Sequence, residues 1–297
     1  MKRIIPTLIF LTCCISSFSQ NVTDSVRLKW KKSFESGLNV NQASFSDNWT
    51  GGGINSIALG TFLNGRILYE GNKFSFDNTL QLMYGFLKNK GQDFRKNTDR
   101  VFADSKLGYK ISSKWNTFVS VNFLSQFAPG YQFAEDGNGN EQAVLISRFL
   151  APGYLTTSAG FEYKPADHFW IRFGIGGLRQ TFVLDTSLYH VIPENYGVPV
   201  HKKVRNEMAF VVTANYDREI AKNLHLKVLL TAFSNYENMA ATDVRSDIVL
   251  TAKVNKFINV NLTGAILYDQ DQDYEVQYSQ GLALGIVYTF SQFEPKK

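Results

Sequence analysis

The sequence predicts an all-β protein: an antiparallel, up-and-down transmembrane β-barrel of about twelve strands. Three observations predict it: segments in which bulky apolar residues alternate with small or polar ones, the similar length of these segments, and connections that alternate between short and long. Alternating units of about ten residues are typical of the strands of outer-membrane barrels, whose lipid-facing and lumen-facing residues take turns along the chain.

Three segments show the alternation most plainly. In each, one face is bulky and apolar and the other is small or polar, which indicates a strand with two different environments. The bulky faces are Trp115, Thr117, Val119, Val121 and Phe123; Leu224, Leu226, Val228 and Leu230; and Leu282, Leu284, Ile286, Tyr288 and Phe290.

The same pattern, followed along the whole chain, gives an even number of strands and so places both termini on one side of the barrel. In order, the expected strands cover residues 27–42, 54–69, 73–87, 101–111, 115–127, 154–164, 168–184, 204–219, 223–235, 244–256, 258–269 and 278–290.

The connections support the same topology. Short turns are expected at 70–72, 112–114, 165–167, 220–222 and near Phe257, and long connections at 43–53, 88–100, 128–153, 185–203, 236–243 and 270–277. Outer-membrane barrels have short periplasmic turns and longer outer loops, so every long connection is expected outside the cell.

The N-terminus predicts export. Residues 1–19 combine a basic start, an apolar stretch and small residues before a cleavage site after Ser19, which is the pattern of a secretory signal peptide. Residues 20–297 would then form a single barrel domain. Both cysteines, Cys13 and Cys14, lie in the signal segment, so the mature chain would have no disulfide and no thiol nucleophile.

Composition narrows the class further. The chain is 44% hydrophobic with a mean hydropathy of -0.17, and no internal apolar run reaches the 18 residues of a membrane helix. The net charge of +5 comes without a run of basic residues between aromatic ones, so we expect no nucleic-acid partner. A soluble periplasmic barrel is the alternative, and the apolar face of the last strand argues against it.

Charged residues of both signs fall on the predicted inner face. They are either ion pairs that fill and close a narrow barrel or the lining of a weakly selective pore, and the sequence favours neither. The candidate lumen-lining residues are Glu35, Asp77, Asp104, Lys106, Glu162, Arg172, Lys227, Arg245, Asp247 and Lys253.

The longest connection, 128–153, lies between two Ala-Pro-Gly-Tyr tetrads that end at Tyr131 and Tyr154. Residues 141–150 within it are expected to form a short helix that folds into the lumen as a plug. The alternative is that they extend a neighbouring strand outward.

Motifs for catalysis are sparse. No HExxH or GxSxG motif is present, and two acidic loops, at 136–140 and 269–273, lack the glycine and closing glutamate of a calcium loop. We therefore expect no catalytic residue, metal or cofactor. The enzymatic alternative is an outer-membrane lipid hydrolase centred on His225, with a Ser or Asn from a neighbouring strand.

Several motifs resemble a Bacteroidota family catalogued as domain of unknown function 3078. They are residues 41–49 (NQASFSDNW), 51–55 (GGGIN), 95–99 (RKNTD), Gln126-Phe127 with Gly130-Tyr131, 149–152 (FLAP) and 234–236 (SNY). The resemblance extends over nearly the whole mature chain and implies an exported, barrel-like protein of no known activity. The motifs cluster where strands meet outer loops, so Trp49, Gly51, Gly52, Tyr131 and Tyr154 are candidates for an outer-loop surface.

Together these observations predict a non-enzymatic outer-membrane barrel that passes or binds a small solute, or serves as an envelope scaffold. The expected partners are outer-membrane lipid, the barrel-assembly machinery and a small solute. Residues 285–290 (GIVYTF) resemble the terminal-strand signal that this machinery reads, and the alternative is an ordinary strand end with girdle aromatics.

Overall fold

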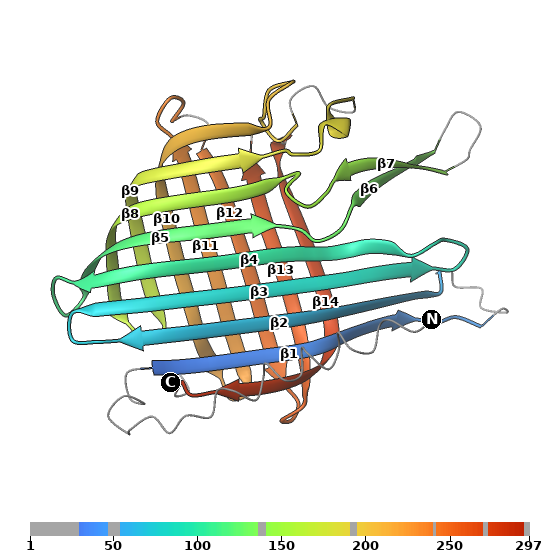
Figure 1. Cartoon of the computed structure of the whole chain (residues 1–297). Coiled ribbons are helices and arrows are strands. Elements are labelled where there is room, and N and C mark those ends of the chain that lie inside the picture. The colour runs from blue at the N-terminus through green and yellow to red at the C-terminus, as the bar shows by residue number, and fades with distance from the viewer. Residues whose placement is uncertain are drawn as a thin grey trace, which may run out of the picture.

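The computed structural model describes residues 30–46, 54–135, 141–190, 195–239, 242–269 and 273–293. Their strands curl into one closed antiparallel barrel of twelve strands (Figure 1). The predicted fold class is confirmed. The signal segment lies outside the described residues.

The barrel strands follow the predicted order. They are β1 (Trp30–Ala43), β2 (Ser56–Glu70), β3 (Phe74–Asn89), β4 (Arg95–Lys110), β5 (Trp115–Ser125), β8 (Gly153–Ala166), β9 (Phe169–Phe182), β10 (Val204–Ala221), β11 (Leu224–Asn235), β12 (Thr242–Lys253), β13 (Ile258–Asp269) and β14 (Asp273–Ser291).

Each barrel strand pairs with the next along the chain, and β1 pairs with β14 to close the ring. Since β6 and β7 lie outside the barrel, β5 pairs directly with β8. Antiparallel pairing of consecutive strands around the ring is the up-and-down arrangement.

Two strands begin five or six residues earlier than predicted, which shortens two outer connections. β4 starts at Arg95 and β14 starts at Asp273, inside segments expected to be loops. Their polar outer ends lack the apolar alternation of the wall, so periodicity alone placed them outside the sheet. The long outer connections that remain are 44–55, 126–152 and 183–203, whereas 90–94 and 270–272 are short.

The connection at 128–153 contains a hairpin rather than a helical plug. β6 (Gly130–Glu135) pairs with β7 (Glu141–Ser147) in a separate two-stranded sheet that projects away from the barrel (Figure 1). The predicted helix at 141–150 is therefore wrong. Val144 and Ile146 suit a strand that pairs locally, because β-branched side chains pack well on a pleated sheet.

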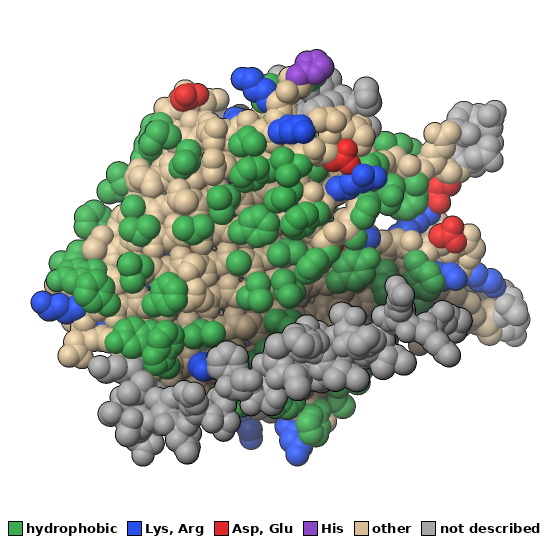
Figure 2. Space-filling model, viewed as in Figure 1, with side chains coloured by type: hydrophobic (Ala, Val, Ile, Leu, Met, Phe, Trp, Pro, Cys, Tyr) green, Lys and Arg blue, Asp and Glu red, His purple; other side chains and the backbone are tan. Residues whose placement is uncertain are grey.

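The outer wall is apolar along the strands, and charged side chains gather toward its two ends (Figure 2). Exposed apolar residues recur at every second position, such as Leu282, Leu284 and Ile286 on β14. In the described part of the chain, no helix is long and apolar enough to cross a membrane.

Aromatic pairs line the end of the wall that carries the short turns. Trp30 packs on Tyr69, Phe74 on Tyr109 and Trp115 on Tyr163, with ring centroids 5.0, 5.2 and 4.9 Å apart. Aromatic girdles of this kind lie at the membrane interface of outer-membrane barrels. An apolar wall that ends in an aromatic girdle is the exterior of a transmembrane barrel.

A small apolar core lies at the opposite end, among the outer connections. Ala151, Val183, Leu188 and Val198 are fully or almost fully buried together, with Leu145 and Tyr196 packed against them. Tyr196 also donates a hydrogen bond to the Ile146 carbonyl at 2.9 Å. The connections beside β8 and β9 are thus folded into a cap.

Candidate functional site

The inner face of the barrel carries most of the buried charge. Strand registers place alternate residues on it, for example Asp77 opposite Lys106 and Glu162 opposite Arg172. The wall is a single sheet with one face toward the outside and one toward the lumen. Side chains on its inner face therefore point into the barrel.

Four candidate residues from three strands meet in one cluster, which we call the inner cluster: Asp104 and Lys106 on β4, Glu162 on β8 and Arg172 on β9. Lys106 Nζ lies 2.8 and 2.6 Å from the two Glu162 carboxylate oxygens. Arg172 Nε donates to Glu162 at 2.8 Å, and its Nη1 lies 3.5 Å from Asp104.

Burial in the inner cluster is nearly complete. The side chains of Lys106, Glu162 and Arg172 are 8%, 1% and 9% exposed. Asn116 on the intervening strand β5 also donates to Glu162, at 3.0 Å. Burial of an unpaired charge costs free energy. The ion pairs and the Asn116 amide offset this cost for Lys106, Glu162 and Arg172.

A second arrangement crosses the barrel. Around the ring, β4 and β12 are opposite strands, with five strands between them on either side. Arg100 on β4 nevertheless reaches Asp247 on β12, with Nη1 and Oδ1 3.5 Å apart. The interior is therefore bridged by side chains at this level.

The two arginines that bind Asp247 differ in geometry. Arg245 holds it with two short hydrogen bonds of 2.9 and 2.7 Å. Arg100 makes the longer contact, and its Nε is buried without a hydrogen-bond partner among the described residues. The Arg100–Asp247 contact is thus the looser connection, and it is the one that spans the lumen.

The remaining lumen candidates are more dispersed. Asp77 accepts two hydrogen bonds from Arg66, at 2.9 and 2.7 Å, and Glu35 accepts one from Asn64 at 3.2 Å. Lys227 is opposite Asp217 in the register of β10 and β11. Lys253 is exposed at the last position of β12, beside a short turn.

Arg179, Arg100 and Asp243 belong to the charged interior but were not among the predicted residues. Arg179 pairs with Asp243 at 2.7 Å and stacks on Phe233 at 3.4 Å from the ring centroid. Arg100 and Asp243 fall in segments expected to be loops.

Arg179 was missed because of a bulge. It is seven positions from Arg172, so strict alternation puts the two on opposite faces, but the register of β8 and β9 skips Ile175. A bulge adds one residue and shifts the alternation.

Arg66 is a different case. It lies in a predicted strand, and counting alternate positions from its neighbours would have found it.

The proposed outer-loop surface is only partly described. Trp49, Gly51 and Gly52 lie outside the described residues. Tyr131 is exposed on the β6–β7 hairpin, whereas Tyr154 is the second residue of β8, with its ring centroid 5.9 Å from Arg179.

His225, the candidate for a lipid hydrolase, pairs with a carboxylate. Its Nε2 lies 2.7 Å from Asp217 Oδ1, and its partners across the two adjacent strands are Glu219 and Thr251. The Ser or Asn expected beside it is at neither paired position. Among the described residues, no group of three or more His, Cys, Asp or Glu side chains could hold a metal ion.

Two family models match different parts of the barrel. Residues 40–131 match a protein of unknown function (DUF3078), and residues 155–290 match a protein of unknown function, DUF481. The expected resemblance to the first family is therefore found from the last four residues of β1 through β5 and into the connection after β5, not over nearly the whole chain. Each model covers less than half of the 297 residues.

Three solved structures with similar folds are a translocator domain and two channels. The translocator domain of autotransporter NalP from Neisseria meningitidis has a TM-score of 0.38 and 10% identity, over 96% of this chain and 95% of that one. An outer membrane channel from Pseudomonas putida F1 has a TM-score of 0.37 and 8% identity, over 88% of this chain and 94% of that one. The TodX monoaromatic hydrocarbon channel has a TM-score of 0.39 and 9% identity, over 89% of this chain and 90% of that one.

TM-scores this low carry no information about a ligand or an activity. No curated relative matches the chain.

Proposed function

We propose that this chain is an integral outer-membrane β-barrel, without catalytic activity, that passes or binds a small polar solute through a lumen whose resting state is closed. The observation that carries this is the Arg100–Asp247 contact between opposite strands. An ion pair that joins opposite strands through one long contact can separate without breaking the wall, as a path for a solute requires.

The chemistry of the interior supports a polar rather than an apolar solute. Charged groups of both signs occupy it at several levels: the Arg66–Asp77 pair, the inner cluster and the Arg179–Asp243 pair. Each would replace part of the hydration shell of a solute that carries charges or hydroxyl groups.

Conductance across planar lipid bilayers tests this proposal. Arg100→Ala removes the looser partner of Asp247 and leaves Asp247 bound to Arg245. An ion pair worth about 1 kcal/mol that holds the lumen closed changes the closed-to-open ratio about fivefold, so we expect the open probability of the channel to rise about fivefold. Asp247→Asn weakens the same contact from the other strand and should act in the same direction.

Arg95→Ala is the matched control. Arg95 lies on the same strand but pairs with Glu141 and stacks on Phe133, both in the β6–β7 hairpin. Its loss should leave conductance unchanged. If folded wild-type protein and both lumen variants are equally non-conducting, the Arg100–Asp247 contact does not control a path through the lumen and the proposal of a closed resting state is wrong.

A further inference from the structure

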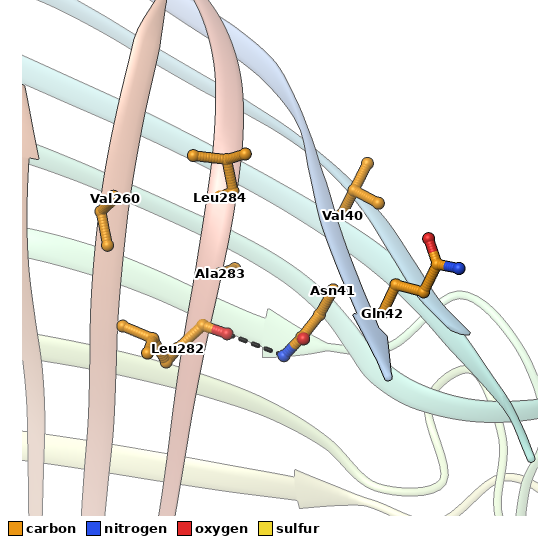
Figure 3. A pocket seen from close by; sticks show the side chains of 7 residues that line it. All are labelled: Val40, Asn41, Gln42, Val260, Leu282, Ala283 and Leu284. Atoms are coloured by element: carbon orange, nitrogen blue, oxygen red, sulfur yellow. Dashed lines mark hydrogen bonds between the residues drawn. The ribbon is translucent and has the colours of Figure 1, made fainter. Parts of the chain in front are cut away.

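The barrel closes between β1 and β14, and this seam is paired over only part of its length. The ladder runs from Ser33–Ser291 to Val40–Leu284. Beyond that point, β1 stays paired with β2 as far as Ala43, while β14 stays paired with β13 as far as Asp273. Each strand continues outward with its other neighbour, and the two separate (Figure 3).

A side-chain contact takes over where the backbone ladder ends. Asn41 Nδ2 donates to the Leu282 carbonyl at 2.9 Å, across the opening (Figure 3). One amide is a weaker closure than a run of backbone pairs, so the seam can open here at small cost.

A groove of about 440 Å³ occupies this opening. Its outward-facing lining is apolar, with Val40, Leu282 and Leu284 all exposed, whereas Asn41 and Ala283 occupy the inward-facing positions of the two strands. The groove therefore has an apolar side toward the outer wall and a polar side toward the barrel interior.

The level of the groove follows from strand geometry. Val40 is ten residues beyond Trp30, which lies in the aromatic girdle. At about 3.3 Å per residue and a tilt of about 40°, that is roughly 25 Å, the height of the apolar band of an outer-membrane barrel. The opening is thus level with the outer leaflet, where acyl chains meet headgroups.

Amide groups lie just inside the seam. The Oδ1 of Asn39 is buried and has no hydrogen-bond partner among the described residues. A Cβ at Gly285 would lie 2.8 Å from this atom and 3.2 Å from Asn261 Nδ2. Glycine at 285 thus lets both amides pack against the seam, and it leaves an acceptor for a hydroxyl or amine donor.

We propose that the β1–β14 seam is a lateral portal that takes the acyl chain of an outer-leaflet amphiphile, whose headgroup donates a hydrogen bond to Asn39. The apolar lining, the level in the membrane and the unsatisfied buried acceptor all point to this chemistry. The proposal rests on the membrane placement proposed above, but not on passage of a polar solute.

Photolabelling tests it. The probe is a monoacylglycerol with a diazirine next to its ester, in phosphatidylcholine vesicles that contain the purified barrel, with labelled residues identified by mass spectrometry. We expect label at Asn39 and Asn261, which face inward beside the seam. Ser120 and Asn122 are the controls, because they face inward on β5, far from it.

Label at Val119 distinguishes failure of the portal from failure of the membrane placement. Val119 faces outward on β5, so it contacts lipid wherever the barrel lies in a membrane. Label at Val119 without label at Asn39 and Asn261 overturns the portal alone. Absence of label from Val119 overturns the membrane placement as well.

A disulfide across the opening provides a second test. In a background without Cys13 and Cys14, Asn41→Cys with Ala283→Cys joins the strands one step beyond the last pair, and it should reduce label at Asn39 and Asn261 at least fivefold. Leu38→Cys with Ile286→Cys joins a pair inside the ladder and should not change it. Equal labelling in the two oxidised variants overturns the proposal.

Discussion

Buried charge is the main feature of this protein at the scale of single residues. Glu162 receives hydrogen bonds from Lys106, Arg172 and Asn116, so one buried carboxylate pairs with two cations. By contrast, Glu70 pairs with Lys31 and Lys164 where all three side chains are about one-third exposed or more. The two glutamates therefore differ in environment far more than in partners.

Glu162→Gln should destabilise the barrel strongly. Lys106 would lose its paired carboxylate and Arg172 would keep only its longer contact with Asp104. Breaking a buried ion pair by removing one partner costs about 3–5 kcal/mol. Glu70→Gln is the matched control, because a partly exposed pair is worth about 1 kcal/mol or less. The measurement is the urea midpoint of unfolding in lipid vesicles, followed by tryptophan fluorescence. Equal midpoints would show that the inner cluster is hydrated rather than buried.

At the scale of strands, the two faces of each strand lie in different environments. On β11, Val228 faces outward between Tyr216 and Ile248, whereas Lys227 faces inward opposite Asp217. Adjacent residues on one strand thus meet lipid and lumen in turn, which follows from the two-residue period of β-structure.

The same new residue placed on the two faces tests this arrangement. Val228→Arg should impair assembly, since an arginine on the lipid side costs about 2–4 kcal/mol at the bilayer midplane. Lys227→Arg keeps the inward charge and should assemble normally. The readout is the fraction of protein whose gel mobility changes on boiling. The reverse order would mean that the faces are exchanged, and equal behaviour would mean that the strands do not lie in a membrane.

Long and short connections separate at the scale of the whole molecule. The turns between β2 and β3, β4 and β5, and β8 and β9 are short and lie at the end of the barrel with the aromatic girdle. The folded cap and the β6–β7 hairpin lie at the other end (Figure 1). Outer-membrane barrels keep their short turns in the periplasm, so we expect the cap and the hairpin outside the cell.

Epitope tags check this orientation. A tag after residue 137, between β6 and β7, should bind antibody on intact cells, and a tag at Asn72, between β2 and β3, should bind only after the outer membrane is permeabilised. Exposure of the Asn72 tag alone would invert the orientation, and exposure of neither in folded protein would remove the barrel from the cell surface.

The sequence by itself determined the twelve strands of the barrel and their order. Alternation fixes which residues share a face, and the lengths of the connections make neighbours of consecutive strands, so twelve strands and a closed barrel could be predicted. It also determined that Asp104, Lys106, Glu162 and Arg172 share the inner face. These are local properties, because each depends on residues close together in the chain.

Only the tertiary structure decided which distant residues meet. The Arg100–Asp247 contact depends on barrel closure and strand stagger, and the unpaired part of the β1–β14 seam depends on how far the first and last strands overlap. The bulge that turns Arg179 inward and the β6–β7 hairpin in place of a helix are likewise set by pairing with neighbouring strands. Sequence periodicity does not show how far neighbouring strands are staggered or where a one-residue bulge lies, so these contacts could not be predicted from it.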